Sequence, residues 1–358
     1  MDKYRIVYFS GTGCTALAAS CLEEALRERG CETVTERIVS VVGGGNFGAE
    51  KDDDIPGTVK AAVIPGMVKD DDTPCTVKDD DIPCMVKDDG TLGIKKPAAV
   101  QPGGAPGAGT LVLLFPVHAC TAPGPVMEWL RELGGAEGGG AEGGGRKGAP
   151  ATVISVSGGG EISPNTASRV SAIKMLEKKG YDVFCEDTLV MPSNIAIATP
   201  EPLSILLLQV LPDKARAIAD GILSGGRKRK APFVIDRFLA WAGKAERGSA
   251  KKWGRSIKAS DECDGCGLCA EQCPTGNITM TDSKPGFSEK CCMCLGCFYA
   301  CTKKALTPKT AKTMILKGFN LKAIEEKALV SERADAAQIP ASLIWLGVKR
   351  YLKEKEKN

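Results

Sequence analysis

Two runs of cysteine with one common spacing constrain this chain more than any other feature of its sequence. Each run has the pattern C-x2-C-x2-C-x3-C, and only the first is followed by proline, at Pro274. The first run is Cys263, Cys266, Cys269 and Cys273, and the second is Cys291, Cys294, Cys297 and Cys301. Thiolates at this spacing converge on [4Fe-4S] clusters, and the fourth cysteine of each run binds the cluster of the other run.

The crossed arrangement predicts two sets of four ligands. Cluster 1 would be held by Cys263, Cys266, Cys269 and Cys301, and cluster 2 by Cys291, Cys294, Cys297 and Cys273. Cys292 is surplus, because only Cys291 keeps the required spacing to Cys294. We expect Gly265, Gly267 and Gly296 to let the backbone approach the sulfurs. Two zinc sites are the alternative, but such sites often include histidine, and the one histidine of this chain is far from both runs.

Composition narrows the class of protein. The chain has 358 residues, 16 of them cysteine, and a net charge of +3, from 47 basic and 44 acidic residues. This balance gives no general reason to expect nucleic acid as a partner. The start "MDKYRIVYFSGTG" does not resemble a signal peptide, and no apolar run reaches the roughly 18 residues of a membrane span. We therefore expect a cytoplasmic protein with reduced thiols and no membrane span.

The first 226 residues alternate between strand and helix patterns. Apolar runs predict strands at 4–9, 32–39, 111–115, 151–156 and 182–190. Helical periodicity lies between them, at 15–29, 125–133, 165–179 and 202–223. This order predicts βαβ units and an α/β fold, a flavodoxin-like five-stranded parallel sheet with helices on both faces. A small α+β domain with the cysteine runs follows.

The loop after the first predicted strand has the pattern S-G-T-G-x-T. It comprises Ser10, Gly11, Thr12, Gly13, Cys14 and Thr15. Hydroxyls and backbone N–H groups at a helix N-terminus can surround a phosphate, and a site without a lysine suits the monoester of FMN. An ordinary strand-to-helix turn with serine and threonine caps is the alternative.

Two later loops are expected to flank the flavin ring. The candidate residues are Pro116, Val117 and His118 in one loop, and Ser157, Gly158, Gly159 and Gly160 in the other. His118 could stack on the ring or simply lie at the surface. Cys120 has only His118 nearby as a base, so we expect no catalytic residue in this loop.

These motifs resemble two known families. The cysteine runs resemble bacterial two-cluster ferredoxins over about 55 residues, and residues 3–42 and 110–225 resemble flavodoxins. The stretches "VYFSGTG", "FPVHA", "SVSGGGE" and "LVMPSN" look like those of clostridial-type flavodoxin–ferredoxin fusions. The resemblance implies an FMN domain joined to two [4Fe-4S] clusters. Cys14 departs from the family, which usually has asparagine there.

Low-complexity segments interrupt this pattern. A nine-residue unit recurs from Lys51, as in "KDDDIPGTV" and "KDDDIPCMV", and a glycine-rich loop spans 134–148. Proline in each unit disfavours helix and paired strand, so we expect a disordered insertion at about 45–108 in which Cys75 and Cys84 have no role. Calcium binding by the aspartates is the alternative.

The expected domains follow from these boundaries. They are a flavodoxin-like domain at 1–226, a basic helical linker at 227–256, a ferredoxin domain at 257–310 and a helical tail at 311–358. The "RKRK" run at 227–230 is expected to be solvated, or else to contact an acidic redox partner.

The expected function is transfer of electrons between the clusters and FMN for an unidentified redox partner protein. Iron–sulfur clusters pass one electron at a time, whereas FMN accepts one or two. One alternative is an FMN-dependent reductase of a quinone or nitro compound. The other is a ferredoxin whose flavin-free domain serves for docking.

Overall fold

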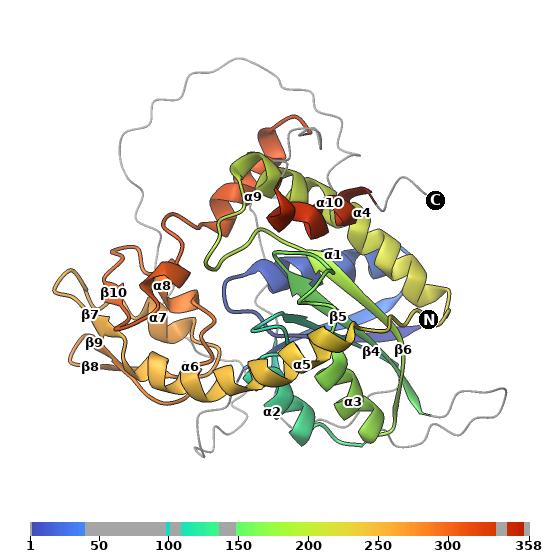
Figure 1. The fold of residues 1–358 in the computed structure, drawn as a ribbon, viewed down its shortest axis with the longest axis horizontal. Coiled ribbons are helices and arrows are strands. Elements are labelled where there is room, and N and C mark those ends of the chain that lie inside the picture. The colour runs from blue at the N-terminus through green and yellow to red at the C-terminus, as the bar shows by residue number, and fades with distance from the viewer. Residues whose placement is uncertain (1, 40–97, 101–108, 136–147, 334–341, 354–358) are drawn as a thin grey trace, which may run out of the picture.

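The computed structural model describes residues 2–39, 98–100, 109–135, 148–333 and 342–353, which form two lobes side by side (Figure 1). The larger lobe contains an all-parallel sheet of order β3-β2-β1-β4-β5-β6. Its strands are β1 (Lys3–Tyr8), β2 (Glu32–Ile38), β3 (Ala98–Val100), β4 (Thr110–Pro116), β5 (Ala149–Ser157) and β6 (Tyr181–Val190). The five predicted strands and the flavodoxin-like α/β fold are confirmed.

The short edge strand β3 lies inside the segment at about 45–108 that was predicted to be a disordered insertion. Ala98–Val100 pairs with the last three residues of β2. The rest of the nonapeptide segment, including Cys75 and Cys84, lies outside the described residues, as do residues 136–147 of the glycine-rich loop.

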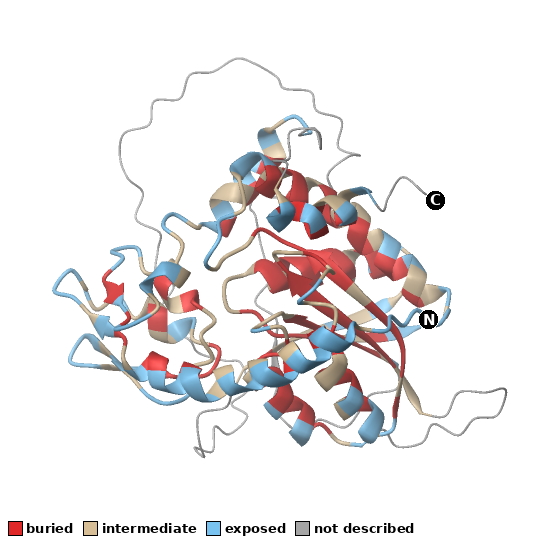
Figure 2. Cartoon of the chain, viewed as in Figure 1, coloured by how far each residue is buried: buried red, intermediate tan, exposed pale blue. Residues whose placement is uncertain are grey.

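Helices cover both faces of the sheet. On one face lie α1 (Cys14–Arg27) and α4 (Glu201–Leu223), and on the other α2 (Gly124–Glu132) and α3 (Val170–Lys178). The central strand β1 supplies both cores because its side chains alternate: Ile6 and Tyr8 lie in the core with α1, whereas Val7, and Phe9 just after the strand, lie in the core with α2. Figure 2 shows the buried residues gathered on the sheet and on the helix sides that face it.

Helix α3 starts five residues later than the sequence predicts. Residues 165–169 form turns instead, and the backbone N–H and hydroxyl of Thr166 donate to the Asp236 carboxylate at 3.2 and 2.5 Å. These bonds to a distant carboxylate hold the segment outside the helix.

Arg169 is the largest fully buried side chain of the described residues. Its guanidinium donates to Glu186 on β6 at 2.8 Å, to Ser155 on β5 at 2.8 Å and to Glu161 in the loop after β5. The network therefore joins two strands to the loop at the carboxyl end of the sheet. Burying one partner alone would cost far more than burying the hydrogen-bonded set.

The basic run at 227–230 is exposed to solvent, but its cations are paired with the sheet lobe. Lys228 forms a parallel bridge beside Cys185 at the β6 edge, through its own backbone N–H and carbonyl. Each of the four cations pairs with a carboxylate of the sheet lobe: Arg227 with Asp182, Lys228 with Asp187, Arg229 with Glu177 and Glu186, and Lys230 with Glu161. The sequence interpretation missed these carboxylates because they lie some 40 to 70 residues earlier in the chain.

Two helical segments connect the lobes: α5 (Val234–Ala242) and, after the 3₁₀ turn η1 (Gly243–Ala245), α6 (Glu246–Arg255). Helix α5 buries a carboxylate and leaves several apolar side chains exposed. Asp236 is fully buried and accepts from Ser163 at 2.6 Å, whereas Val234, Phe238 and Trp241 are more than half exposed. A single buried carboxylate thus sets which side of this helix meets the sheet lobe.

The smaller lobe is assembled from two short antiparallel pairs and two short helices. Its elements are β7 (Lys258–Ala259) with β10 (Leu306–Thr307), β8 (Ile278–Thr281) with β9 (Lys284–Phe287), α7 (Leu268–Glu271) and α8 (Gly296–Ala300). Its apolar core includes Trp253 from α6, together with Ile257, Ile278 and Phe298. The segment just before the cysteine runs therefore belongs to this lobe's core.

The chain then returns to the sheet lobe. Its last described elements are η2 (Lys312–Met314), α9 (Leu321–Val330), η4 (Leu343–Trp345) and α10 (Leu346–Lys353). Leu321 and Ala328 of α9 join the core on the α1 and α4 side, and Val348 and Tyr351 of α10 pack with Leu207 of α4. Within the described parts of the chain, no helix is both long and apolar enough to cross a membrane.

Replacing Arg169 with leucine should lower the free energy of unfolding by about 3 kcal/mol, because Glu161 and Glu186 lose a buried cation. Chemical denaturation of the full chain measures the change. Lys174→Leu, on the exposed side of the same helix, is the matched control and should change stability by less than about 0.5 kcal/mol. Equal effects of the two substitutions would contradict the proposed role of the network.

Candidate functional site

The eight cysteines of the two runs lie around two small cavities of the smaller lobe. Cys263, Cys266, Cys269 and Cys301 line the first cavity. Cys273, Cys291, Cys294 and Cys297 line the second, and Cys292 also borders it. The fourth cysteine of each run is thus beside the first three of the other run, as crossed ligation requires. Among the described residues, no group of three or more His, Cys, Asp or Glu side chains is arranged to hold a single metal ion.

The fourth cysteine of each run, which lies beside the other run, accepts a hydrogen bond from a backbone N–H group at the same position in both runs. Asn277 donates to Cys273 Sγ at 3.3 Å, and Ala305 donates to Cys301 Sγ at 3.3 Å, each from four residues later. Met293 donates likewise to Cys291 Sγ at 3.3 Å. Such bonds stabilise the thiolate form and, in iron–sulfur proteins, raise the reduction potential.

The two runs reach the same turn geometry with different residues. Gly265 and Gly267 have positive φ values of 76° and 78° in the first run. The matching positions of the second run are Met293 and Leu295, with φ values of 54° and 64°. A non-glycine residue costs about 1–2 kcal/mol in this conformation. Gly296 differs from these positions because its φ is not positive and its Cα faces the Gly11 carbonyl of the sheet lobe. Its backbone still forms a hydrogen bond with the Cys294 sulfur, as expected.

Burial opposes ionisation of the second set of thiols. It raises the pKa of Cys291 to about 12 and also raises the pKa of Cys297. Cys294 differs, because a hydrogen bond from the surplus Cys292 thiol lowers its pKa to about 7. Of Cys291, Cys294 and Cys297, the thiol that ionises most readily is therefore Cys294, next to the sheet lobe.

The two cysteine sets differ in their surroundings. Cys266 of the first set is exposed, and its cavity is bordered by Asp264 and Lys303 near the surface. The second set faces the carboxyl end of the parallel sheet, where Cys292 packs against the core between the sheet and α2. The first set is therefore reachable from solvent at Cys266, whereas the second set is covered by the sheet lobe.

The S-G-T-G-x-T loop lies against the second cysteine run. A Cβ placed on Gly11 would be 2.4 Å from Cys294 Cβ, and one placed on Gly296 would be 2.4 Å from the Gly11 carbonyl oxygen. The loop hydroxyls are also engaged: Ser10 Oγ accepts from the Gly13 N–H at 3.2 Å, and Thr12 Oγ1 accepts from Asn194 at 2.5 Å.

The rest of this loop is enclosed as well. Thr15 and Cys14 are buried, and burial raises the pKa of the Cys14 thiol to about 12. Arg37 donates to the Ser10 carbonyl at 2.9 Å, and a Cβ on Gly13 would be 3.0 Å from Leu321 of α9. The helix N-terminus that was expected to face a phosphate is thus flanked by α9.

The two expected ring loops are covered in the same way. After β4, which ends at Pro116, the Val117 N–H bonds to Val156, and a Cβ on Gly243 of η1 would be 1.9 Å from the Ala119 carbonyl oxygen. After β5, a Cβ on Gly347 of α10 would be 2.0 Å from the Gly159 carbonyl oxygen.

The other residues of these loops face the protein itself. Ser157 accepts from the Gly160 N–H at 3.0 Å, and Gly158 lies against Ser193. The His118 ring meets Phe9 edge-on at 6.5 Å, and burial lowers its pKa to about 4 against an opposing hydrogen bond with the Cys292 backbone. His118 is therefore a neutral contact between the lobes.

The residues at this edge do not fit FMN in the arrangement described. The phosphate loop and both ring loops each approach a backbone or side chain from the linker, the second cysteine run or the tail. A mononucleotide needs these same surfaces. The sequence predicted a close approach at Gly296, toward the sulfurs, but did not identify the covering positions Gly243 and Gly347, although a glycine within a helical pattern can have a packing role.

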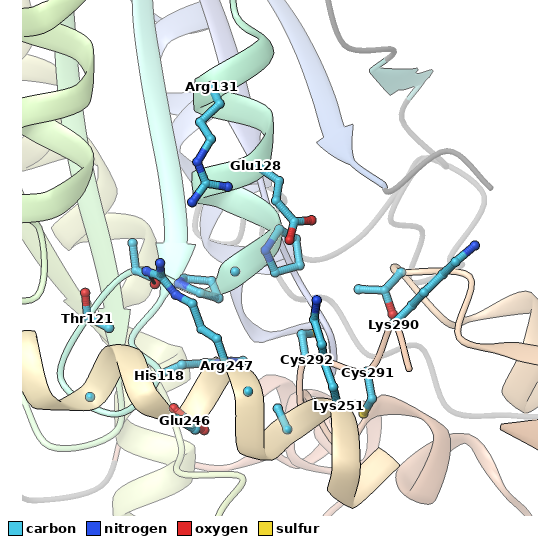
Figure 3. A pocket seen from close by; sticks show the side chains of 18 residues that line it. His118, Thr121, Glu128, Arg131, Glu246, Arg247, Lys251, Lys290, Cys291 and Cys292 are labelled. Atoms are coloured by element: carbon cyan, nitrogen blue, oxygen red, sulfur yellow. Dashed lines mark hydrogen bonds between the residues drawn. The ribbon is translucent and has the colours of Figure 1, made fainter. Parts of the chain in front are cut away.

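A cavity of about 350 Å³ lies beside this contact, between α2, α6 and the second cysteine run. Figure 3 shows Arg131 reaching into it from α2, and Arg247 and Lys251 from α6. Sequence analysis did not identify these cations, because they come from two helices separated by more than 100 residues.

One part of the chain matches a known protein family. The family model of the 4Fe-4S binding domain matches residues 258–279, which contain the first cysteine run. A search of curated proteins finds no match to this chain. The match supports iron–sulfur electron transfer and at least one [4Fe-4S] cluster.

Replacing Gly296 with alanine should loosen the contact between the lobes, because the new methyl group would overlap the Gly11 carbonyl. We expect amide hydrogen exchange in residues 10–15 and 291–297 to become about tenfold faster, which corresponds to ~1.4 kcal/mol. Gly248→Ala, in α6 with nothing within 4 Å of the added group, is the control. Unchanged exchange in the Gly296 variant would refute the close contact.

Glu325 of α9 should make stability depend on pH. Burial raises its pKa from 4.5 to about 7, so between these values the folded chain keeps a proton that the unfolded chain releases. The free energy of unfolding should therefore fall, by up to ~3 kcal/mol, as pH rises from about 4.5 to 7. Glu325→Gln should flatten this part of a denaturation-against-pH curve, whereas Glu326→Gln, at an exposed neighbour, should preserve most of it.

Proposed function

We propose that this protein is an electron carrier of the ferredoxin type that holds two [4Fe-4S] clusters, with its flavodoxin-like lobe acting as a flavin-free scaffold. The observation that carries the proposal is the meeting of each four-cysteine set around its own cavity, with the second set pressed against the sheet edge. Each bound cluster would supply one-electron chemistry at low potential.

The cysteines have distinct parts in this proposal. Cys263, Cys266, Cys269 and Cys301 would hold cluster 1, and Cys273, Cys291, Cys294 and Cys297 would hold cluster 2. The exposed Cys266 side offers a docking point for a redox partner protein. The N–H groups of Asn277 and Ala305 would hold negative charge on the two crossing sulfurs.

The scaffold would protect cluster 2. Cys292 borders its cavity and packs against the apolar core of the sheet lobe, and Trp253 and Phe287 also border the cavity. Excluding water strengthens hydrogen bonds to sulfur, so this shell would tune the potential of the second cluster separately from the first.

FMN binding is the second candidate, favoured by the S-G-T-G-x-T loop and by the resemblance to flavodoxin–ferredoxin fusions. It requires the linker, the second cysteine run and the tail to move off the sheet edge. The flavin-free scaffold needs no such movement, so we favour it.

Anaerobic purification with iron, sulfide and flavin measured together tests both candidates. We expect about eight irons and eight sulfides per chain and no flavin. Addition of FMN should leave the washed protein without flavin absorbance; a stoichiometric yellow complex would establish the FMN candidate instead. Zinc in place of iron would refute both.

Substitution of single cysteines tests the ligand sets. Cys301→Ser should reduce iron to about four per chain, because it removes a ligand of cluster 1 only. Cys292→Ser, at the surplus cysteine next to the second run, is the matched control and should retain about eight irons per chain. Loss of iron from the Cys292 variant, or none from the Cys301 variant, would overturn the assignment; electron paramagnetic resonance of the reduced proteins identifies which cluster is lost.

A further inference from the structure

The cavity between α2 and α6 is separate from the two cysteine cavities and has its own chemistry. Its volume of about 350 Å³ is at the lower end of the range for small-ligand sites. Cys291 borders it on one side and the loop after β4 on another, so it opens beside the contact between the lobes.

Cations from opposite walls point into this space. Figure 3 shows the Arg131 guanidinium descending from α2 toward that of Arg247 on α6, with the Lys251 ammonium entering from below. Among the described residues, none of these three side chains forms an ion pair within 4.0 Å. Lys290, Glu128 and Glu246 also line the cavity, so its four cations exceed its two carboxylates by two even when both carboxylates are ionised.

The Arg247 guanidinium has a hydrogen-bond donor without an acceptor. One of its terminal nitrogens donates to the Ala122 carbonyl at 3.0 Å, whereas its buried Nε has no hydrogen-bond partner in the described structure. Desolvation and the nearby Arg131 charge both lower its pKa. A buried donor of a charged group without an acceptor is costly, and an oxyanion would supply that acceptor.

The start of α2 adds one uncharged donor. Its N-cap is Pro123 with no side-chain cap, and Pro123, Gly124 and Pro125 line the cavity, but of these only Gly124 has a backbone N–H. The first N–H groups of a helix have no partner within the helix and favour negative charge.

From these features we infer that the cavity binds a small organic or inorganic anion bearing carboxylate or phosphate groups. Arg131 and Arg247 hold the anion from opposite walls, and Lys251 contributes a further cation at the cavity mouth. This cavity does not include the S-G-T-G-x-T loop, whose Gly11 and Gly13 face the second cysteine run and α9, although it shares His118 with the first expected ring loop.

Calorimetric titration of the anaerobic full chain tests the site, with citrate and inorganic phosphate as probes and the neutral compound glycerol as the reference. Citrate or phosphate should bind with one site per chain, and glycerol should not. Arg247→Gln and Arg131→Gln should each weaken binding by roughly 10- to 100-fold, the range for loss of a charge-assisted bond. Arg237→Gln, at an exposed arginine of α5, is the matched control and should bind as the parent does.

The variants also separate binding from folding. Thermal unfolding of each variant without a probe shows whether it is folded, and Lys251→Met provides a second test at the less enclosed cation, with an expected loss of at least about threefold. Absence of citrate and phosphate binding to the parent chain, or equal binding by folded Arg131 and Arg247 variants, would overturn the inference. Neither readout measures iron, sulfide or flavin, so failure here is distinguishable from failure of the proposed function.

Discussion

The contact between Gly11 and the turn of Cys294 and Gly296 is the constraint on which the two-lobe arrangement depends. It brings backbone against backbone, at a separation that leaves no space for a side chain on either glycine. The carboxyl end of a parallel sheet is ordinarily where such folds bind ligands. Here later segments of the chain cover that end and hold the smaller lobe against it.

Much of the sheet lobe could be predicted from local pattern, because buried strands such as β4 and β5 are short apolar runs bounded by turn residues. Strand β3 could not, since three residues in a proline-rich segment carry too little periodicity. The late start of α3 depends on a hydrogen bond from Thr166 to Asp236, seventy residues away. Local sequence carries no information about such a partner.

The cysteine spacing predicted which four side chains would meet, because ligand geometry fixes short separations along the chain. It did not predict that Met293 and Leu295 would adopt the conformation that glycine has in the first run. Packing compensates: Leu295 is buried in the apolar core of the smaller lobe. The covering of the sheet edge was also beyond sequence reasoning, since the S-G-T-G-x-T pattern is the same whether a phosphate or a protein backbone lies against it.

The three glycines of the covering segments limit how far the two lobes could be exchanged with those of other proteins. Gly243, Gly296 and Gly347 come from the linker, the cysteine lobe and the tail, yet each meets a different loop of one sheet edge. A cysteine lobe transplanted onto another parallel sheet would bring only one of these three contacts with it. The halves of this protein are therefore not interchangeable modules, and a change at any one loop is tolerated only if the opposing segment changes with it.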